Sequence, residues 1–138
     1  MNLVKQTFEN SCLLACLESF LLDNGKTVTQ KEMISILHPL GYCTEKGDVD
    51  INRQTEALKH IGLDIKEIDF SYPVVELSKN KAILIGTTIP GMHCRRIVKQ
   101  EEEGKIIMME PIDGSFIYWD IASIENSQPK YYEVRLRH

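Results

Sequence analysis

The chain lacks the features that place a protein in a membrane, on nucleic acid or in a disulfide framework. No segment approaches the roughly 18 consecutive apolar residues that a membrane helix needs, and residues 1–11 lack the apolar stretch of a secretory signal. The net charge is −4 and the basic residues are scattered, whereas nucleic-acid binding needs a concentrated basic face. We therefore expect a cytoplasmic protein with no membrane segment and no nucleic-acid partner.

The cysteines lack the spacing of a disulfide framework. The four residues Cys12, Cys16, Cys43 and Cys94 form no disulfide pattern, so in a reducing compartment we expect free thiols. No Cys-x-x-Cys or His-x-x-x-His pair is present, which argues against a structural zinc site. We expect no cofactor, and at least one cysteine then needs a chemical reason to be there.

What the sequence does contain is enough apolar material for one globular core. It has 138 residues, of which 43% are hydrophobic and 26% are charged. This size and this balance are typical of a single domain. We therefore predict one domain over residues 1–138, with a helical half at about 1–62 and a sheet half at about 63–138.

The helical half shows the apolar periodicity of helices. It predicts one helix that begins at Cys12 and stops before Gly25, a second over residues 29–37 and a third over residues 51–61. Asn10 or Ser11 is placed to cap the first helix, because either side chain can accept from the unpaired N–H groups of a first turn. The second helix begins with the spacing of a capping box.

The sheet half contains short apolar and alternating runs. The run over residues 82–85 is typical of a strand buried on both faces, and residues 93–99 and 105–110 flank a charged loop and predict a hairpin. Residues 116–119 form a further strand, and residues 132–136 alternate as a half-buried strand should. Helices followed by an antiparallel sheet predict an α+β fold, with the N-terminal helices packed on the C-terminal sheet.

Cys12 is the residue on which a chemical function can be built. At the first turn of a helix, the partial positive charge of the helix N-terminus favours a thiolate, which is the reactive form of cysteine. Gln6 lies six residues upstream, where its amide and the Cys12 N–H could together hold an oxyanion. His93 opens a strand after a Pro-Gly-Met turn and could face the helix start as a general base and acid.

An acid to orient His93 is expected from the hairpin. The strands over 93–99 and 105–110 run antiparallel, so the end of the second lies beside the start of the first. Glu110 is therefore expected next to His93, where a carboxylate can fix the imidazole tautomer and stabilise the charged ring. Asp113, three residues later in the turn, remains the alternative acid.

A longer stretch around Cys12 resembles a known family. Residues 6–17, QTFENSCLLACL, resemble the opening motif of the bacteriocin-processing peptidases. These are papain-like domains that cut leader peptides after a double glycine and are often fused to an ABC exporter. The likeness continues over about the whole chain in the family's order, with His93 leading a strand and Glu110 followed by Pro111 and Gly114.

The resemblance implies a papain-like cysteine peptidase fold and a role for each candidate residue. By it Cys12 is the nucleophile, His93 the base, Gln6 the oxyanion donor and Glu110 the orienting acid. The chain departs from the family in three respects. Ser11 and Leu13 stand where the family usually has Asp and Gly, and Glu110 replaces the expected Asp. His93 is followed by Cys94-Arg95-Arg96, where the family has aromatic or aliphatic residues.

Several functions are compatible with this set of residues. The first is a thiol hydrolase that cleaves a peptide or amide bond of a peptide or protein substrate through a Cys12 thioester. A deamidase or an acyltransferase could use the same Cys–His pair, because both pass through a thioester. A peptidase-like module that binds a peptide or protein without cleaving it is the alternative from another class. The oligomeric state is left open.

Overall fold

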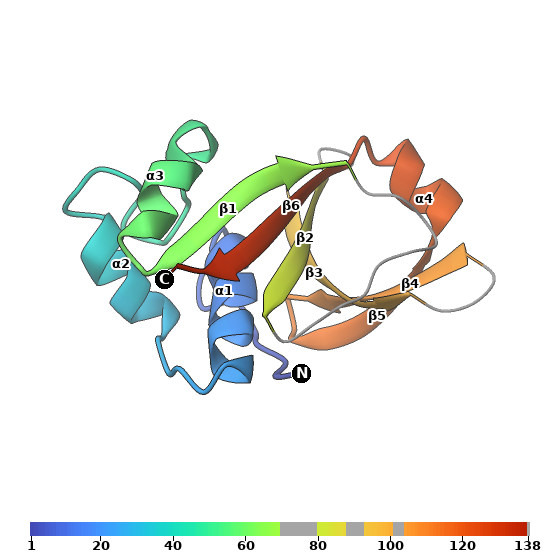
Figure 1. Cartoon of the computed structure of the whole chain (residues 1–138), viewed down its shortest axis with the longest axis horizontal. Helices are drawn as coiled ribbons and strands as arrows, with labels where there is room; N and C mark the ends of the chain where they lie inside the picture. The colour runs from blue at the N-terminus through green and yellow to red at the C-terminus, as the bar shows by residue number, and fades with distance from the viewer. Residues whose placement is uncertain (70–79, 88–92, 101–103, 138) are drawn as a thin grey trace.

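The molecule is a layered arrangement of helices and one antiparallel sheet (Figure 1). The structure is a computed structural model that describes residues 1–69, 80–87, 93–100 and 104–137. Its elements, in chain order, are α1 (Cys12–Asp23), α2 (Gln30–Leu37), the 3₁₀ turn η1 (Ile51–Arg53), α3 (Gln54–Lys59), β1 (Leu63–Ile68), β2 (Lys81–Thr87), β3 (His93–Gln100), β4 (Lys105–Glu110), β5 (Ser115–Asp120), α4 (Ile121–Asn126) and β6 (Lys130–Leu136). Helices precede strands apart from α4, which confirms the predicted α+β class.

The strand order in the sheet is β1-β6-β2-β3-β4-β5, and each neighbouring pair is antiparallel. The hairpin of β3 and β4 is as predicted. The last strand, β6, is inserted between β1 and β2 rather than added at an edge. Its residues therefore lie inside the sheet beside β2, where they help to form the pocket described below.

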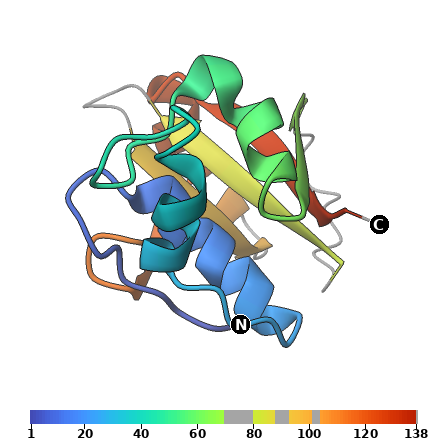
Figure 2. The same cartoon turned by 90° about the vertical axis from the view of Figure 1, so that its left-hand side faces the viewer.

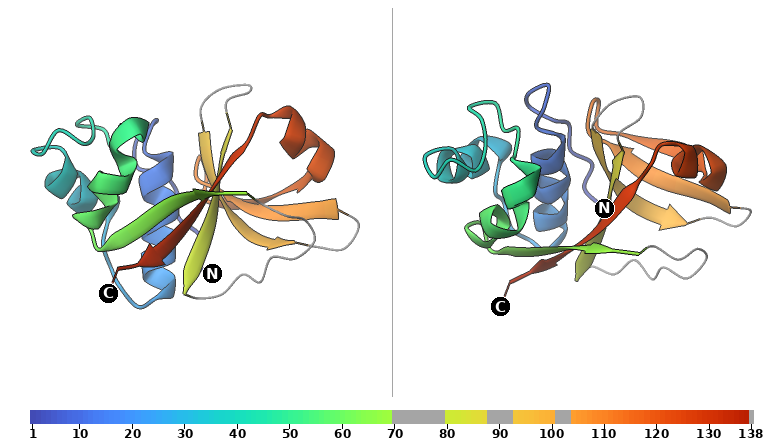
Figure 3. Two further views of the ribbon diagram at one scale, coloured as in Figure 1. Left: turned by 45° about the horizontal axis from the view of Figure 1, so that its top comes forward. Right: turned by 90° about the horizontal axis from the view of Figure 1, so that it is seen from above.

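The sheet is covered on both faces, with α1–α3 on one side and α4 on the other (Figures 1 and 3). On the first side α1 packs on β3 and β2, and α3 packs on β1. On the second side a smaller cluster joins isoleucines of β2, β3 and β4 to Ile124 of α4. The apolar run of β2 supplies both clusters, with Leu84 in the first and Ile85 in the second, as expected for a strand buried on both faces.

The start of α1 differs from the prediction. Ser11 is the residue before the helix, but its side chain makes no capping hydrogen bond. Instead the Ser11 hydroxyl donates to Gln30 Oε1 at 2.8 Å and accepts from the backbone N–H of Phe8 at 3.0 Å. The cap was predicted from local chain geometry, and a partner from α2 competes successfully for the same hydroxyl. The N–H groups of the first turn of α1 are left without that cap.

Gln30 of α2 also holds the segment that leads into α1. Its Oε1 accepts from the N–H of Thr7 at 2.8 Å, and its Nε2 donates to the carbonyl of Lys5 at 2.9 Å and to Glu18 at 3.0 Å. The side chain is 2% exposed, so these bonds form away from water and are expensive to break.

The capping box of Thr29 and Glu32, which was predicted, is formed and places Gln30 at the first helical position. Figure 2 shows α1, α2 and α3 gathered in front of the sheet.

The third predicted helix is shorter and less regular than expected. Residues 51–53 form a 3₁₀ turn and the α-helix covers only Gln54–Lys59, ending before Gly62. Asp50 caps this region by accepting from the N–H of Asn52. Within residues 1–69, 80–87, 93–100 and 104–137, no helix is both long enough and apolar enough to cross a membrane.

Candidate active site

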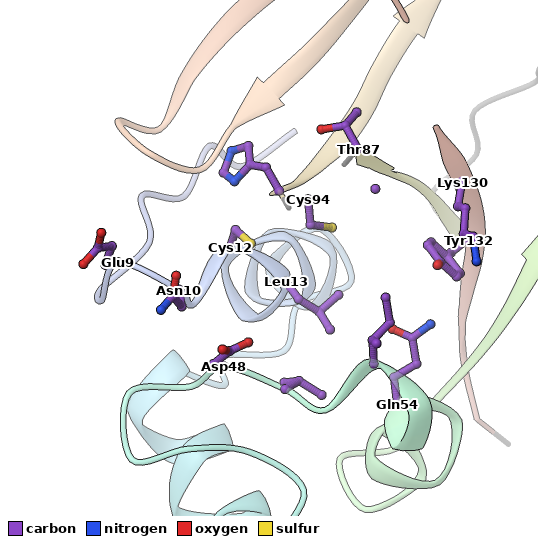
Figure 4. A pocket seen from close by; sticks show the side chains of 14 residues that line it. Glu9, Asn10, Cys12, Leu13, Asp48, Gln54, Thr87, Cys94, Lys130 and Tyr132 are labelled. Atoms are coloured by element: carbon purple, nitrogen blue, oxygen red, sulfur yellow. The ribbon is translucent and has the colours of Figure 1, made fainter. Parts of the chain in front are cut away.

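Cys12 lies at the mouth of a pocket between α1 and the sheet (Figure 4). It is the first residue of α1 and is partly exposed. The pocket has a volume of about 260 Å³. Its walls come from the start of α1, the segment before α3, the ends of β2 and β3 and the beginning of β6, and they comprise Glu9, Asn10, Cys12, Leu13, Asp48, Val49, Ile51, Gln54, Gly86, Thr87, His93, Cys94, Lys130 and Tyr132.

His93 lines the same pocket and interacts with Cys12. It is the first residue of β3, and the packing of α1 on β3 brings it to the start of the helix. Burial alone lowers the pKa of His93, but hydrogen bonding with Cys12 and with Glu110 outweighs burial and raises the pKa to about 9. At neutral pH the ring is therefore an imidazolium, with both nitrogens as donors.

The acid that contacts His93 is Glu110, the last residue of β4. Its Oε2 lies 2.5 Å from His93 Nε2, which leaves the other ring nitrogen for the thiol. Burial raises the pKa of Glu110, but the His93 hydrogen bond and the charge of Arg95 hold the pKa below its usual value. Asp113 is exposed and accepts instead from the N–H and hydroxyl of Ser115, so it does not serve His93.

Gln6 lies close to this group but is engaged elsewhere. Its backbone N–H donates to the carbonyl of Pro111 at 2.6 Å, which ties the segment before α1 to the end of β4. Its side-chain Nε2 donates to the carbonyl of Glu9 at 2.6 Å, and its buried Oε1 has no partner among the described residues. Gln6 is not among the residues that line the pocket. Nε2 carries two hydrogens, so one remains available beyond the bond to Glu9.

The uncapped first turn of α1 supplies a second possible anion-binding group. The first N–H groups of a helix have no intrahelical partner, and the Ser11 side chain does not satisfy them here. The helix dipole adds a partial positive charge at the same point. The N–H of Cys12 can therefore donate to an oxygen that gains negative charge when the neighbouring thiol attacks a carbonyl.

Several lining residues were not singled out by the sequence. Cys94 lines the pocket as well, and its carbonyl accepts from the Cys16 thiol at 3.8 Å. Hydrogen bonding with Cys16 and burial raise the pKa of the Cys94 thiol well above its usual value. Tyr132 of β6 was read only as a strand residue, because nothing local indicates that β6 enters the middle of the sheet.

Arg95 is the other residue that the sequence did not mark as part of the site. Its Nε donates to Glu110 Oε1 at 3.0 Å. The alternation of a strand puts residues 93 and 95 on the same face, and this is the one signal that could have identified it. Among the described residues, no group of three His, Cys, Asp or Glu side chains could hold a metal ion.

Comparisons by sequence find no relative, and a comparison of structures finds the fold. Neither a protein-family model nor a curated protein sequence matches the chain. Among solved structures, the chain is similar to the peptidase domain of Streptococcus ComA, a bi-functional ABC transporter involved in a quorum-sensing pathway. The TM-score is 0.74 at 14% identity, and the match covers 99% of this chain and 98% of that domain. The chain therefore has the papain-like fold of this peptidase domain, which agrees at the level of fold with the resemblance carried by residues 6–17.

Proposed function

We propose that the protein is a papain-like thiol hydrolase that cleaves a peptide or amide bond of a peptide or protein substrate. The observation that carries this proposal is that Cys12 and His93 line one open pocket and that Glu110 hydrogen-bonds to the ring of His93. A nucleophile, a base and a group that orients the base are the minimum for thioester chemistry. A protein that only binds peptides needs none of the three.

In the proposed reaction, the Cys12 sulfur attacks the substrate carbonyl carbon. The carbonyl oxygen becomes an oxyanion and accepts from the Cys12 N–H, with Gln6 as the second donor. The His93 imidazolium then gives its proton to the leaving nitrogen, the C–N bond breaks and a thioester remains on Cys12. The neutral ring next takes a proton from water, whose oxygen attacks the thioester and releases the acid and the thiolate.

Glu110 serves this cycle without bonding to the substrate. Its carboxylate accepts from His93 Nε2, so the ring keeps the orientation in which its other nitrogen faces the thiol. The negative charge also stabilises the imidazolium, which forms or persists at each stage before the leaving group departs. The pocket next to Cys12 supplies the binding surface, with Leu13, Val49 and Tyr132 as its apolar part.

The proposal is tested first by the reactivity of Cys12. The chain is treated with iodoacetamide at pH 5.5, and the alkylated positions are located by mass spectrometry. An ordinary thiol with a pKa of about 8.5 is ionised to roughly one part in a thousand at this pH, whereas a thiolate paired with an imidazolium reacts. We expect labelling at Cys12 that is lost in His93→Ala, with Cys43, which is 8% exposed, as an internal control.

The second arm tests bond cleavage. A peptide library is incubated with the wild-type chain and with Cys12→Ala, and new termini are identified by mass spectrometry. We expect cleavage that needs both Cys12 and His93. Peptide binding by the wild-type chain without cleavage, together with slow labelling of Cys12, would overturn the hydrolase and support the binding module.

A further inference from the structure

Two consecutive arginines on β3, Arg95 and Arg96, are buried on opposite faces of the sheet. Arg96 faces α1, where it forms a salt bridge with Asp23 at 2.7 Å. Arg95 faces the other way and is only 9% exposed. A buried guanidinium costs free energy unless its donors are paired, so the partners of Arg95 indicate what it is there for.

The register of β3 and β4 places Arg95 directly beside the acid of the site. Arg96 pairs with Met109, which puts Arg95 opposite Glu110 and His93 two residues further along the same face. Glu110 therefore has Arg95 as its cross-strand neighbour and His93 as its diagonal neighbour, and long side chains reach both. The strand register therefore places the Glu110 carboxylate within reach of both the Arg95 guanidinium and the His93 ring.

The two carboxylate oxygens of Glu110 are divided between these partners. Oε1 accepts from Arg95 Nε at 3.0 Å, and Oε2 accepts from His93 Nε2 at 2.5 Å and from the N–H of Ile112 at 3.4 Å. A glutamate side chain has one more torsion than an aspartate and loses more rotamer freedom when it is held still. An anchor on Oε1 restricts the torsion that would otherwise let Oε2 swing away from the ring.

Arg95 is itself held by two further groups. Its guanidinium lies over the Trp119 ring, 4.5 Å from the centroid, and its Nη1 donates to the Thr87 hydroxyl at 3.4 Å. Trp119 belongs to β5 and Thr87 to β2, so strands on both sides of the β3–β4 hairpin fix this side chain. Contact with an aromatic face and a bonded guanidinium is an arrangement that lysine cannot reproduce.

We propose that Arg95 is a positioning residue that acts on His93 through Glu110, with Thr87 and Trp119 holding it in place. This inference rests on the proposed function for its effect on turnover, but its effect on the ring of His93 does not. Arg95 touches neither the thiol nor the pocket. Its contribution is to keep the Glu110 carboxylate at the ring throughout the reaction.

The first experiment measures the pKa of His93 by NMR in Cys12→Ala, so that the thiol does not titrate together with the ring. The variants are Arg95→Met, Glu110→Gln and both together, with Lys99→Met as the matched control, because it removes a positive charge from an exposed position of the same strand. If Arg95 positions Glu110, Arg95→Met lowers the His93 pKa toward its ordinary value of about 6.5. In the Glu110→Gln background the same change has no such effect.

The direction in which the His93 pKa changes distinguishes a positioning role of Arg95 from an effect of its charge alone. A cation that only competes for Glu110 depresses the His93 pKa, so its removal would raise that pKa. A rise in Arg95→Met, or no change, overturns the proposal. If Arg95→Met does not fold, Arg95→Lys is titrated instead. It keeps the charge but not the guanidinium, so wild-type behaviour of Arg95→Lys also overturns the proposal.

The second experiment uses a substrate found with the peptide library. We expect Arg95→Met to lower kcat by roughly 10-fold to 100-fold, the range for a misplaced catalytic group, with KM within about 2-fold. In Glu110→Gln the same change lowers kcat no further, because the two residues act in one series. Equal losses in both backgrounds overturn the proposal. If the wild-type chain cleaves nothing, the hydrolase fails, and the titration still decides the role of Arg95.

Discussion

The two ends of α1 carry similar groups but differ in how completely those groups are paired. At the C-terminal end, Asp23 accepts from Arg96 on one oxygen and from the N–H and side chain of Asn2 on the other, each at 2.7 Å. Ser19 completes this end by accepting from Arg96 at 2.8 Å and donating to the carbonyl of Asn2. Asp23 and Ser19 are thus fully paired within the protein, and Arg96 Nε is the one buried nitrogen of this group without a partner among the described residues.

At the N-terminal end, groups are left free at the pocket. Ser11 bonds to Gln30 and Phe8 instead of capping the helix, and Cys12 is open to the pocket beside His93. Internal pairing stabilises the first end, whereas the second leaves the Cys12 thiol and the first N–H groups of the helix open to the pocket. Under the proposed function, one helix serves as a structural anchor at one end and as a reactive centre at the other, because local pairing differs along it.

The largest effect should come from removing the nucleophile. Cys12→Ala takes away the atom that forms the thioester, so we expect kcat/KM to fall by roughly 10⁴-fold or more. The free energy of unfolding should change by less than about 1 kcal/mol, because the side chain is partly exposed and alanine suits a helix. Kinetics and urea unfolding measure the two quantities. Substantial residual turnover would show that another group carries the reaction.

At the C-terminal end of α1 we expect a substitution to lower stability and leave turnover unchanged. Arg96→Met leaves Asp23 without its cation and should lower the free energy of unfolding by roughly 3 kcal/mol, as for a buried ion pair that loses one partner. The kcat of the folded fraction should stay within about 2-fold of the wild type. Urea unfolding and active-site titration of Cys12 check both points. A large fall in kcat with unchanged stability would erase the distinction between the two ends.

Gln6 tests whether the N-terminal end binds an oxyanion. Gln6→Ala removes the second proposed donor and should lower kcat by roughly 10²-fold to 10³-fold with little change in KM. Steady-state kinetics measure the effect, and circular dichroism checks that the fold persists. Among the described residues, the Gln6 side chain donates only to the carbonyl of Glu9, three residues away. An effect on KM alone would therefore mean that the amide orders the chain before α1 and does not act on the reaction.

The pH dependence should distinguish turnover from the reactivity of the Cys12 thiol. The proposed reaction needs the His93 imidazolium as an acid. We therefore expect kcat/KM to fall about 10-fold for each pH unit above the His93 pKa of about 9. Alkylation of Cys12 needs only the thiolate and should not fall. A common decline of both rates at high pH would point to unfolding instead.

The raised pKa of His93 also has a consequence for stability. Its folded-state pKa of about 9 lies above the ordinary value of 6.5. The contribution of the charged ring is therefore fully present below about pH 6.5, and it is lost as the pH rises through about 9. His93→Gln should thus destabilise the protein more at pH 6 than at pH 9.5, as measured by urea unfolding at each pH.

The smallest effect is expected at the wall of the pocket. Gly86 lies in β2, and a Cβ there would meet Tyr132 Cε2 at 3.5 Å, an ordinary contact. Gly86→Val should therefore fold but fill part of the pocket with three carbon atoms, and we expect KM to rise by roughly 10-fold, since one methylene in an apolar pocket is worth about 1–3 kcal/mol. Gly86→Ala is the milder control. An unchanged KM would place the substrate away from this wall.

The local sequence pattern was sufficient to predict much of the fold and the contact between Glu110 and His93. The periodicity of residues 12–23 and the capping box before Gln30 follow from side-chain spacing alone. The hairpin over β3 and β4 brings Glu110 to His93 through antiparallel register, which sequence alternation and a charged loop are enough to predict. The short strand β1 and the helix α4 were not expected, because each is brief and owes its stability to packing on distant residues.

What the sequence by itself determined is the α+β class, the first helix and the hairpin register that brings Glu110 to His93. Only the tertiary structure decided that Ser11 turns from the helix to Gln30, that β6 enters between β1 and β2 to bring Tyr132 to the pocket, and that Arg95 shares Glu110 with His93. These are competitions among partners far apart in the chain. A hydroxyl or carboxylate bonds to whichever partner packing brings within about 3 Å. Local periodicity therefore cannot predict that partner.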